Sequence, residues 1–151
     1  MIVDAVRGTE LLAQLPESAI DFLESVASEA GFRPGEMLFD ESGVSDTFYV
    51  IVHGRVGLEL TTPGGPPLVI QTLRDGDLIG VSWFFPPFRW EWRARALVDT
   101  AAIAFDAAAV RDKCVEDCEL ERQLLRSIAK ATALRLHASR TQLLDLYGSR
   151  R

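Results

Sequence analysis

The chain has 151 residues, of which 48% are hydrophobic and 25% are charged, and its formal net charge at pH 7 is −6. This length fits one ordinary domain, and the composition excludes a disordered or fibrous chain. The acidic balance disfavours a broad nucleic-acid surface, and the absence of a roughly 20-residue apolar span or a secretion signal favours the cytoplasm.

Apolar residues in the first third of the chain recur three and four positions apart, which is typical of an amphipathic helix. Pro16 suits the first turn of such a helix. Gly31 suits its end, because the turn pair Pro34-Gly35 follows directly. We therefore expect a helix from about Pro16 to about Gly31.

The middle of the chain changes to short runs rich in β-branched and aromatic residues, separated by turn residues. The runs are 37–40, 47–54, 56–60, 67–73, 77–85, 92–98 and 102–106. Strand-sized segments at this pitch predict a sandwich or a barrel rather than β-α-β units. The proline- and glycine-rich residues 63–67 predict a hairpin tip.

Two helices are expected after Phe105, one over Ala107–Asp117 and a longer one to about Tyr147, with Leu124 and Ile128 on its apolar stripe. About 30 helical residues would reach some 45 Å. That is longer than a small roll can cover, so part of the stripe is expected to pack against a second copy. We therefore predict a symmetric homodimer.

The segment 32–60 carries the motifs P-G-E, then G before an Asp turn, then Y-x-I-x-x-G-x-V. The motifs L-x-x-G-D-x-x-G and D-T-x-x-x-A-x-D follow later in the chain. The matching residues are Gly35, Glu36, Gly43, Asp46, Tyr49, Ile51, Gly54, Val56, Leu73, Gly76, Asp77, Gly80, Asp99, Thr100, Ala104 and Asp106. This order resembles the cyclic-nucleotide-binding domain shared by catabolite activator proteins, protein-kinase regulatory subunits and nucleotide-gated channels.

The resemblance covers the chain from about Leu11 to Tyr147 and implies its fold class. We expect one α+β domain over residues 1–151, with a jelly-roll-like antiparallel β-roll (a double-stranded β-helix) at about 35–106. An N-terminal helix precedes the roll, and C-terminal helices at about 107–147 include the long dimerisation helix. The resemblance implies a regulatory or sensor domain.

The phosphate-binding cassette of this family is altered here. In the family, a Gly-Glu pair opens a short helix, and a later Arg followed by Ser/Thr and Ala grips the cyclic phosphate. Gly80 matches, but Val81 stands at the Glu position. Counting back from Asp99-Thr100 places the Arg-Ser/Thr-Ala step on residues 90–92, Trp-Glu-Trp. The resemblance therefore implies that the ribose and phosphate partners are both missing.

Two interpretations of this segment stay open. In the first, Arg89 or Arg93 takes the charge of a cyclic nucleotide or another small anion, and a tryptophan offers a stacking surface. The candidate ligand-binding residues are then Gly80, Val81, Ser82, Arg89, Trp90, Arg93 and Ser139, the last as a cap on the ligand's base. Strand alternation would place Trp90 and Trp92 on one face and Arg93 on the other. In the second interpretation the pocket is filled and ligand-free, and Ser139 is an ordinary solvated helix residue.

The aromatic loop around Pro86-Pro87, with Phe84, Phe85 and Phe88, also has two interpretations. It is either a docking site for an unknown protein partner or a plug that packs on the roll itself. The first makes the chain a ligand-free structural or adaptor subunit.

Catalysis, metal binding and DNA reading are all disfavoured. The only histidines, His53 and His137, lie far apart in sequence, whereas a metal site needs three or four ligands. No nucleophile–base pair is recognisable, so we expect no enzyme.

Cys114 and Cys118 would share one helical face, with their separation near the upper limit for a disulfide, so we expect reduced thiols. The winged helix-turn-helix of the family's transcription regulators has no room here, so we expect a stand-alone domain without specific DNA binding.

Overall fold

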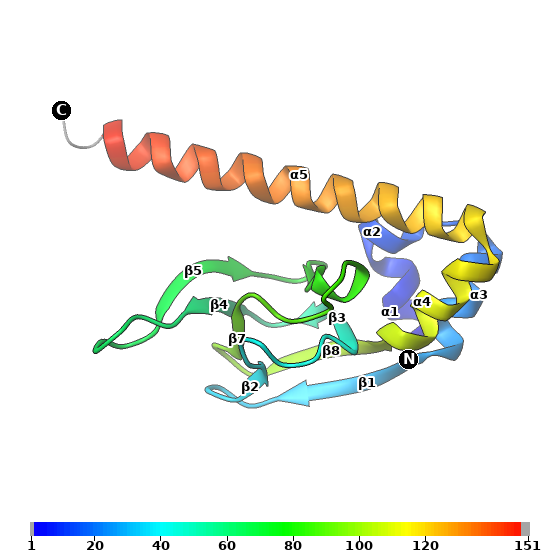
Figure 1. The fold of residues 1–151 in the computed structure, drawn as a ribbon, viewed down its shortest axis with the longest axis horizontal. Coiled ribbons are helices and arrows are strands. Elements are labelled where there is room, and N and C mark those ends of the chain that lie inside the picture. Colours follow the sequence, from blue (N-terminus) through cyan, green and yellow to red (C-terminus); the bar gives the residue numbers. More distant parts are fainter. Residues whose placement is uncertain (1, 149–151) are drawn as a thin grey trace.

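The computed structural model describes residues 2–148, which form two four-stranded antiparallel sheets with helices at one end (Figure 1). The helices at that end are α1 (Ile2–Gly8), α2 (Glu10–Ala13), α3 (Glu17–Ser25) and α4 (Ala107–Glu116). The last helix, α5 (Cys118–Gly148), begins at the same end and runs back over the roll. The α+β class and the β-roll predicted from the sequence are confirmed.

The predicted helix from Pro16 to Gly31 is correct at its start and wrong at its end. Pro16 is the N-cap of α3, but the helix stops at Ser25, and Ala27–Phe32 form strand β1. This strand pairs with β8 over its whole length, from Ala27 opposite Phe105 onward. The ladder satisfies the backbone of residues whose own preference is helical or neutral, so tertiary pairing overrides local propensity.

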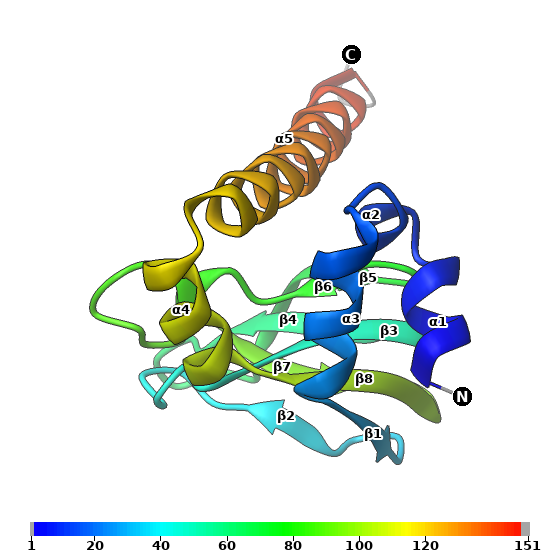
Figure 2. The ribbon, with the colours of Figure 1, turned by 90° about the vertical axis from the view of Figure 1, so that its right-hand side faces the viewer.

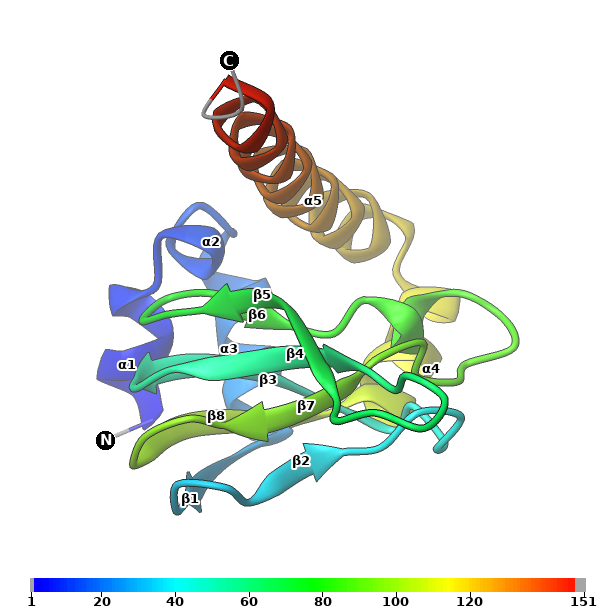
Figure 3. The ribbon, with the colours of Figure 1, turned by 90° about the vertical axis from the view of Figure 1, so that its left-hand side faces the viewer.

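Most of the remaining strands agree with the predicted runs, although β8 starts two residues earlier than predicted. The run 77–85 is wrong beyond its start, because only Leu78–Ile79 are strand and Ser82–Phe84 form a 3-10 helix. The remaining strands are β2 (Met37–Phe39), β3 (Thr47–His53), β4 (Val56–Leu60), β5 (Leu68–Leu73), β6 (Leu78–Ile79), β7 (Arg93–Ala96) and β8 (Thr100–Asp106). One sheet has the order β1-β8-β3-β6 and the other β2-β7-β4-β5. Figure 3 shows the second sheet in front of the first, with β5 nearest to α5.

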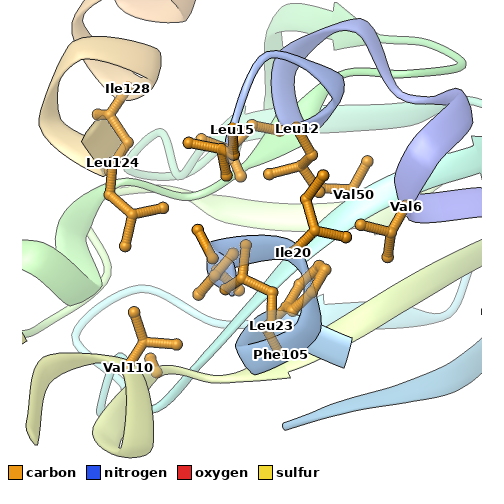
Figure 4. Packing of buried hydrophobic residues seen from close by; sticks show 14 of the residues in the cluster. Val6, Leu12, Leu15, Ile20, Leu23, Val50, Phe105, Val110, Leu124 and Ile128 are labelled. Atoms are coloured by element: carbon orange, nitrogen blue, oxygen red, sulfur yellow. The ribbon is translucent and has the colours of Figure 1, made fainter. Parts of the chain in front are cut away.

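Two apolar cores hold the fold together. The core inside the roll is formed by Ile51, Val56, Leu58, Leu73, Ile79 and Ala94. The larger core joins the helices to the first sheet, and Figure 4 shows Leu124 and Ile128 of α5 in it together with Leu15 and Leu23. Leu124 and Ile128 therefore stabilise the protomer itself, so they are not the surface that a second copy would contact.

The turn between β3 and β4 shows why one family glycine is needed. Gly54 has φ of +136°, and a Cβ there would lie 2.5 Å from the hydroxyl oxygen of Thr100. Its N–H donates to Asp75 Oδ1 at 2.9 Å. Only glycine combines this backbone conformation with so close an approach.

Side-chain caps start both C-terminal helices. Asp106 accepts from the N–H of Ala109 at 3.1 Å, and Asp117 accepts from the N–H of Leu120 at 3.0 Å. The break between the two helices makes the predicted shared helical face of the cysteines wrong, because Cys118 belongs to α5. Figure 2 shows α5 rising away from the sheets beyond its first turns. Within the described chain, none of the helices is long and apolar enough to cross a membrane.

Candidate ligand-binding site

The cassette segment, residues 80–96, follows β6 and ends with β7. It opens with a single 3-10 turn, Ser82–Phe84. The aromatic loop comes next, and Arg89 then forms an isolated bridge with Val44. The segment is therefore held at both ends by the sheets and in its middle by the 40–45 turn.

Trp90 fills the space beside Gly80. Gly80 has φ of +92°, and a Cβ added there would lie 2.3 Å from the indole ring of Trp90. The indole stacks on Phe39 with ring centroids 3.7 Å apart and an interplanar angle of 9°. Trp90 is only 6% exposed, and its backbone N–H donates to Gly43 O at 3.0 Å. The side chain is thus a packed part of the roll.

The two candidate arginines bind the 40–42 turn. Arg89 Nη1 donates to Ser42 O at 3.2 Å, and Arg93 Nε donates to Asp40 Oδ1 at 2.9 Å. The hydrogen bond from Arg93 holds the pKa of Asp40 below its usual range. Both guanidinium groups therefore already have partners beside the cassette segment.

The predicted alternation along this segment is wrong. Trp90 is buried, whereas Trp92 is 37% exposed, so the two indoles do not share one environment. Residues 91–92 form a bend, and the strand begins only at Arg93. Within β7 the small residue Ala94 belongs to the core inside the roll, so Arg93 points to the opposite face.

The other cassette residues contribute mainly packing. Val81 packs against the larger core, and Ser82 starts the 3-10 turn. Trp83 is fully buried and stacks on Phe48 with centroids 4.2 Å apart. Its indole N–H donates to Gly80 O at 3.2 Å. Trp83 is therefore a core residue and not an available stacking surface.

Ser139 lies apart from this cluster, on the second half of α5. Within residues 2–148 it makes no hydrogen bond with the cassette segment. The structure thus brings together Gly80, Trp90 and the two arginines around one turn, while the role of Ser139 as a cap stays a prediction.

Sequence reasoning missed Arg111, which anchors the aromatic loop from α4. Its Nη1 donates to Trp83 O at 2.6 Å and to Ser45 O at 3.1 Å. Its guanidinium carbon lies 4.4 Å from the centroid of the Phe88 ring. A lone arginine on a short helix gives no sequence signal of this kind, because the contact joins segments far apart in the chain.

Residues 2–148 contain no cluster of three or more His, Cys, Asp or Glu side chains arranged to hold a metal ion. The polar groups of the cassette segment are mainly arginines, backbone amides, indole N–H groups and one hydroxyl, with Glu91 as the one carboxylate. This donor set suits an anion and offers no nucleophile activated by a neighbouring base.

Comparison with known proteins finds the family model described as the cyclic nucleotide-binding domain, which matches residues 30–117. The CRP-like cAMP-activated global transcriptional regulator of Mycobacterium tuberculosis is 27% identical over 129 residues, covering 85% of this chain and 56% of that protein. This chain therefore spans about half the length of that curated relative.

Two solved structures share the fold. A cyclic nucleotide-binding protein from Geobacter metallireducens has a TM-score of 0.82 at 21% identity, covering 91% of this chain and 99% of that one. The N-terminal domain of a transcriptional regulator from Streptomyces coelicolor has a TM-score of 0.69 at 26% identity, covering 89% and 94% of the two chains.

Proposed function

The chain belongs to the cyclic nucleotide-binding domain family, and from this premise we propose that it is a non-catalytic regulatory domain whose altered cassette does not bind cyclic AMP tightly. The single observation that carries this proposal is the indole of Trp90, packed against Gly80 and stacked on Phe39. A cyclic phosphate beside Gly80 would have to displace this buried ring.

The chemistry of the segment supports the same conclusion. A cyclic phosphate is a monoanion, and taking it out of water requires a fixed cation. The resemblance places that cation where Trp90 stands and places a carboxylate where Val81 stands. Arg89 and Arg93 are the nearest substitutes, but each would have to leave its bond to the 40–42 turn.

A thermal-shift assay tests this proposal directly. Binding to the native state raises the melting temperature, so we expect no rise with millimolar cyclic AMP or cyclic GMP. A rise of several degrees at micromolar nucleotide would show that the cassette works through contacts other than those considered above. A positive hit among other small anions would support a sensor for a different ligand.

We further propose that the domain is a homodimer through a second stripe on α5. The stripe comprises Leu125, Ala129, Thr132, Leu136, Ser139, Leu143 and Leu146, whose positions alternate by four and three. Such spacing is the 3.5-residue period of a coiled-coil seam. Leu136 is 50% exposed and Leu143 is 53% exposed. This stripe lies beside the Leu124 face that packs on the protomer, which leaves it available to a second copy.

The adaptor function is a second candidate, and the aromatic loop favours it. Phe85 is 51% exposed, while Arg111 holds the neighbouring loop in place. A preorganised aromatic side chain loses little entropy when a partner binds. Phe85→Ser should therefore leave the melting temperature unchanged, whereas Phe88→Ser should lower it because Phe88 packs under Arg111. A large loss with Phe85→Ser would make Phe85 a structural plug.

The cytoplasm and the lack of specific DNA binding remain part of this proposal. The net charge of −6 opposes a phosphate-binding surface. Sequence-selective, salt-sensitive binding of duplex DNA by this chain at physiological ionic strength would contradict it.

A further inference from the structure

The aromatic loop, residues 84–88, is joined to the rest of the fold by few backbone hydrogen bonds. It projects beside α4 (Figure 2), and residues 85–88 belong to no helix or strand. Pro86 and Pro87 have no N–H to donate. At the end of the loop, Phe88 O accepts from the N–H of Ser45 at 2.7 Å. The backbone alone therefore anchors this loop weakly.

Two unfavourable features coincide where the loop meets Ser45. Phe88 has φ of +57°, in the left-handed region that a bulky side chain rarely adopts. The hydroxyl of Ser45 is fully buried, and within the described residues it has no hydrogen-bond partner. Buried polar groups are almost always partnered, and backbone strain persists only where surrounding contacts impose it. The closed position of the loop therefore carries a local free-energy cost that other contacts must offset.

Arg111 of α4 supplies those contacts. Its Nη1 donates to Trp83 O at 2.6 Å, just before the loop, and to Ser45 O at 3.1 Å. Its guanidinium carbon lies 4.4 Å from the centroid of the Phe88 ring, at the end of the loop. The ion pairs within residues 2–148 do not include Arg111, so its guanidinium is committed to these three contacts. One side chain thus holds both ends of the loop.

Opening of residues 85–88 would leave the apolar cores in place. Phe85 is exposed, Phe88 is half-buried, and neither belongs to the two cores described above. Trp83 is fully buried and stacks on Phe48, and Phe84 packs against the larger core. Trp83 and Phe84 therefore fix the start of the loop, and the residues after them can move without unfolding the sheets.

From these observations we propose that residues 85–88 form a gate that opens locally while the sheets and α5 stay folded, with Arg111 as the residue that keeps it closed. The open form is a minor population, in which the Phe88 ring leaves Arg111 and the Ser45 hydroxyl reaches water. The use of this gate rests on the adaptor function proposed above. The closed loop offers a partner the exposed ring of Phe85, whereas the open loop offers Phe85 and Phe88 together, so a partner that binds both rings would shift the population toward the open form.

Limited digestion of the whole chain with chymotrypsin measures the open population, because this protease cleaves after phenylalanine in mobile backbone. The Phe88–Arg89 bond is the target, whereas the Phe85–Pro86 bond resists cleavage because proline follows. When opening and closing are faster than cleavage, the cleavage rate is proportional to the open population. We expect the folded chain to be cut first within residues 84–89. Low urea should hardly change this rate, because local opening exposes little surface.

Two substitutions should change the cleavage rate in opposite directions. Arg111→Gln should raise it at least about tenfold, because the closed form loses charge-assisted hydrogen bonds. Ser45→Ala should lower it several-fold, because the closed form no longer buries an unpartnered hydroxyl. The matched control is Lys113→Gln, because Lys113 Nζ lies 5.8 Å from the centroid of the Phe22 ring in α3 and not on the loop. This control should leave the rate unchanged.

Urea unfolding checks the global stability of each variant, and Ser45→Ala keeps the test valid if Arg111→Gln unfolds. A cleavage rate that follows global unfolding in urea would overturn the proposal, because the loop would then open only with the whole fold. Faster cleavage of Ser45→Ala at unchanged global stability would also overturn it, because the buried hydroxyl would then favour the closed form. The digestion needs no partner, so its result is separate from the adaptor function: a chain that docks no protein can still open this loop.

Discussion

Trp90 and Gly80 are one structural unit, because the ring occupies the space where a side chain on Gly80 would stand. Gly80→Ala should destabilise the fold by about 1–3 kcal/mol through overpacking, in addition to the cost of a positive φ of about 1–2 kcal/mol. Gly76→Ala is the matched control, because Gly76 has φ of +85° with nothing within 4 Å of the added Cβ.

A double-mutant cycle in urea separates the two contributions. In a Trp90→Leu background the added Cβ of residue 80 no longer meets the indole. Gly80→Ala should therefore lower the free energy of unfolding less in that background, by at least about 1 kcal/mol. Gly76→Ala should lower the free energy of unfolding by the same amount in the wild-type and Trp90→Leu backgrounds. Additive losses at Gly80 and Trp90 would mean that the indole does not restrict the space beside Gly80.

The two cysteines differ in burial, and their reactivity should differ accordingly. Burial raises the pKa of Cys114 to about 11, whereas Cys118 is exposed at the start of α5. At pH 8, Ellman's reagent should quickly modify one thiol per folded chain. Cys118→Ser should remove that reaction, and Cys114→Ser should leave it intact. Two fast-reacting thiols in the folded protein would contradict the packing of α4.

Asp75 makes the stability of the β3–β4 turn depend on pH. The N–H of Gly54 lowers the pKa of this carboxyl, and His53 lowers it further. A lowered native pKa stabilises the fold above the unfolded value of about 3.9, and this contribution is lost as the pH falls through the native pKa. Asp75→Asn should therefore melt below the wild type at pH 7, with a difference that shrinks toward pH 3. A constant difference across that range would exclude the charge as its cause.

At the scale of secondary-structure elements, strands and helices with strong periodicity were predictable, and those defined by distant partners were not. The run 47–54 is rich in β-branched and aromatic residues and became β3 with small changes. The segment 27–32 is a strand only because β8 pairs with it. The bend at residues 91–92 also depends on distant contacts, because Trp90 and Arg93 are held by the 40–43 turn.

The second stripe of α5 gives the prediction for this scale. The double variant Leu136→Glu and Leu143→Glu should convert dimers to monomers at micromolar concentration, because it places charges in the apolar seam. Its helix content should remain, since neither residue packs in the protomer core. Light scattering and circular dichroism measure the two properties.

Leu144→Glu is the matched control, because Leu144 is 72% exposed and lies outside the stripe. It should leave the dimer intact. A wild-type chain that is already monomeric, or dissociation by Leu144→Glu to the same extent, would contradict this assignment of the seam.

At the scale of the whole molecule, the order of the family motifs was enough to predict the fold, while the candidate site was predictable only in its composition. Val81 and Trp90 could be read as departures from the cassette. The stacking of Trp90 on Phe39 and the binding of Arg93 to Asp40 could not, because both partners lie at the end of β2, some fifty residues earlier.

Calorimetric titration with cyclic AMP tests the central claim most directly. Charge-assisted hydrogen bonds contribute roughly 1.5–3 kcal/mol each, so losing the family's arginine and carboxylate contacts should weaken binding by a few orders of magnitude. We predict no saturable heat below millimolar nucleotide for the wild type, Arg89→Ala or Arg93→Ala. Micromolar binding of cyclic AMP by the wild type would contradict the account. If one of the two alanine substitutions abolished that binding, the substituted arginine would be the phosphate partner. If the binding survived both substitutions, the nucleotide would bind through other groups.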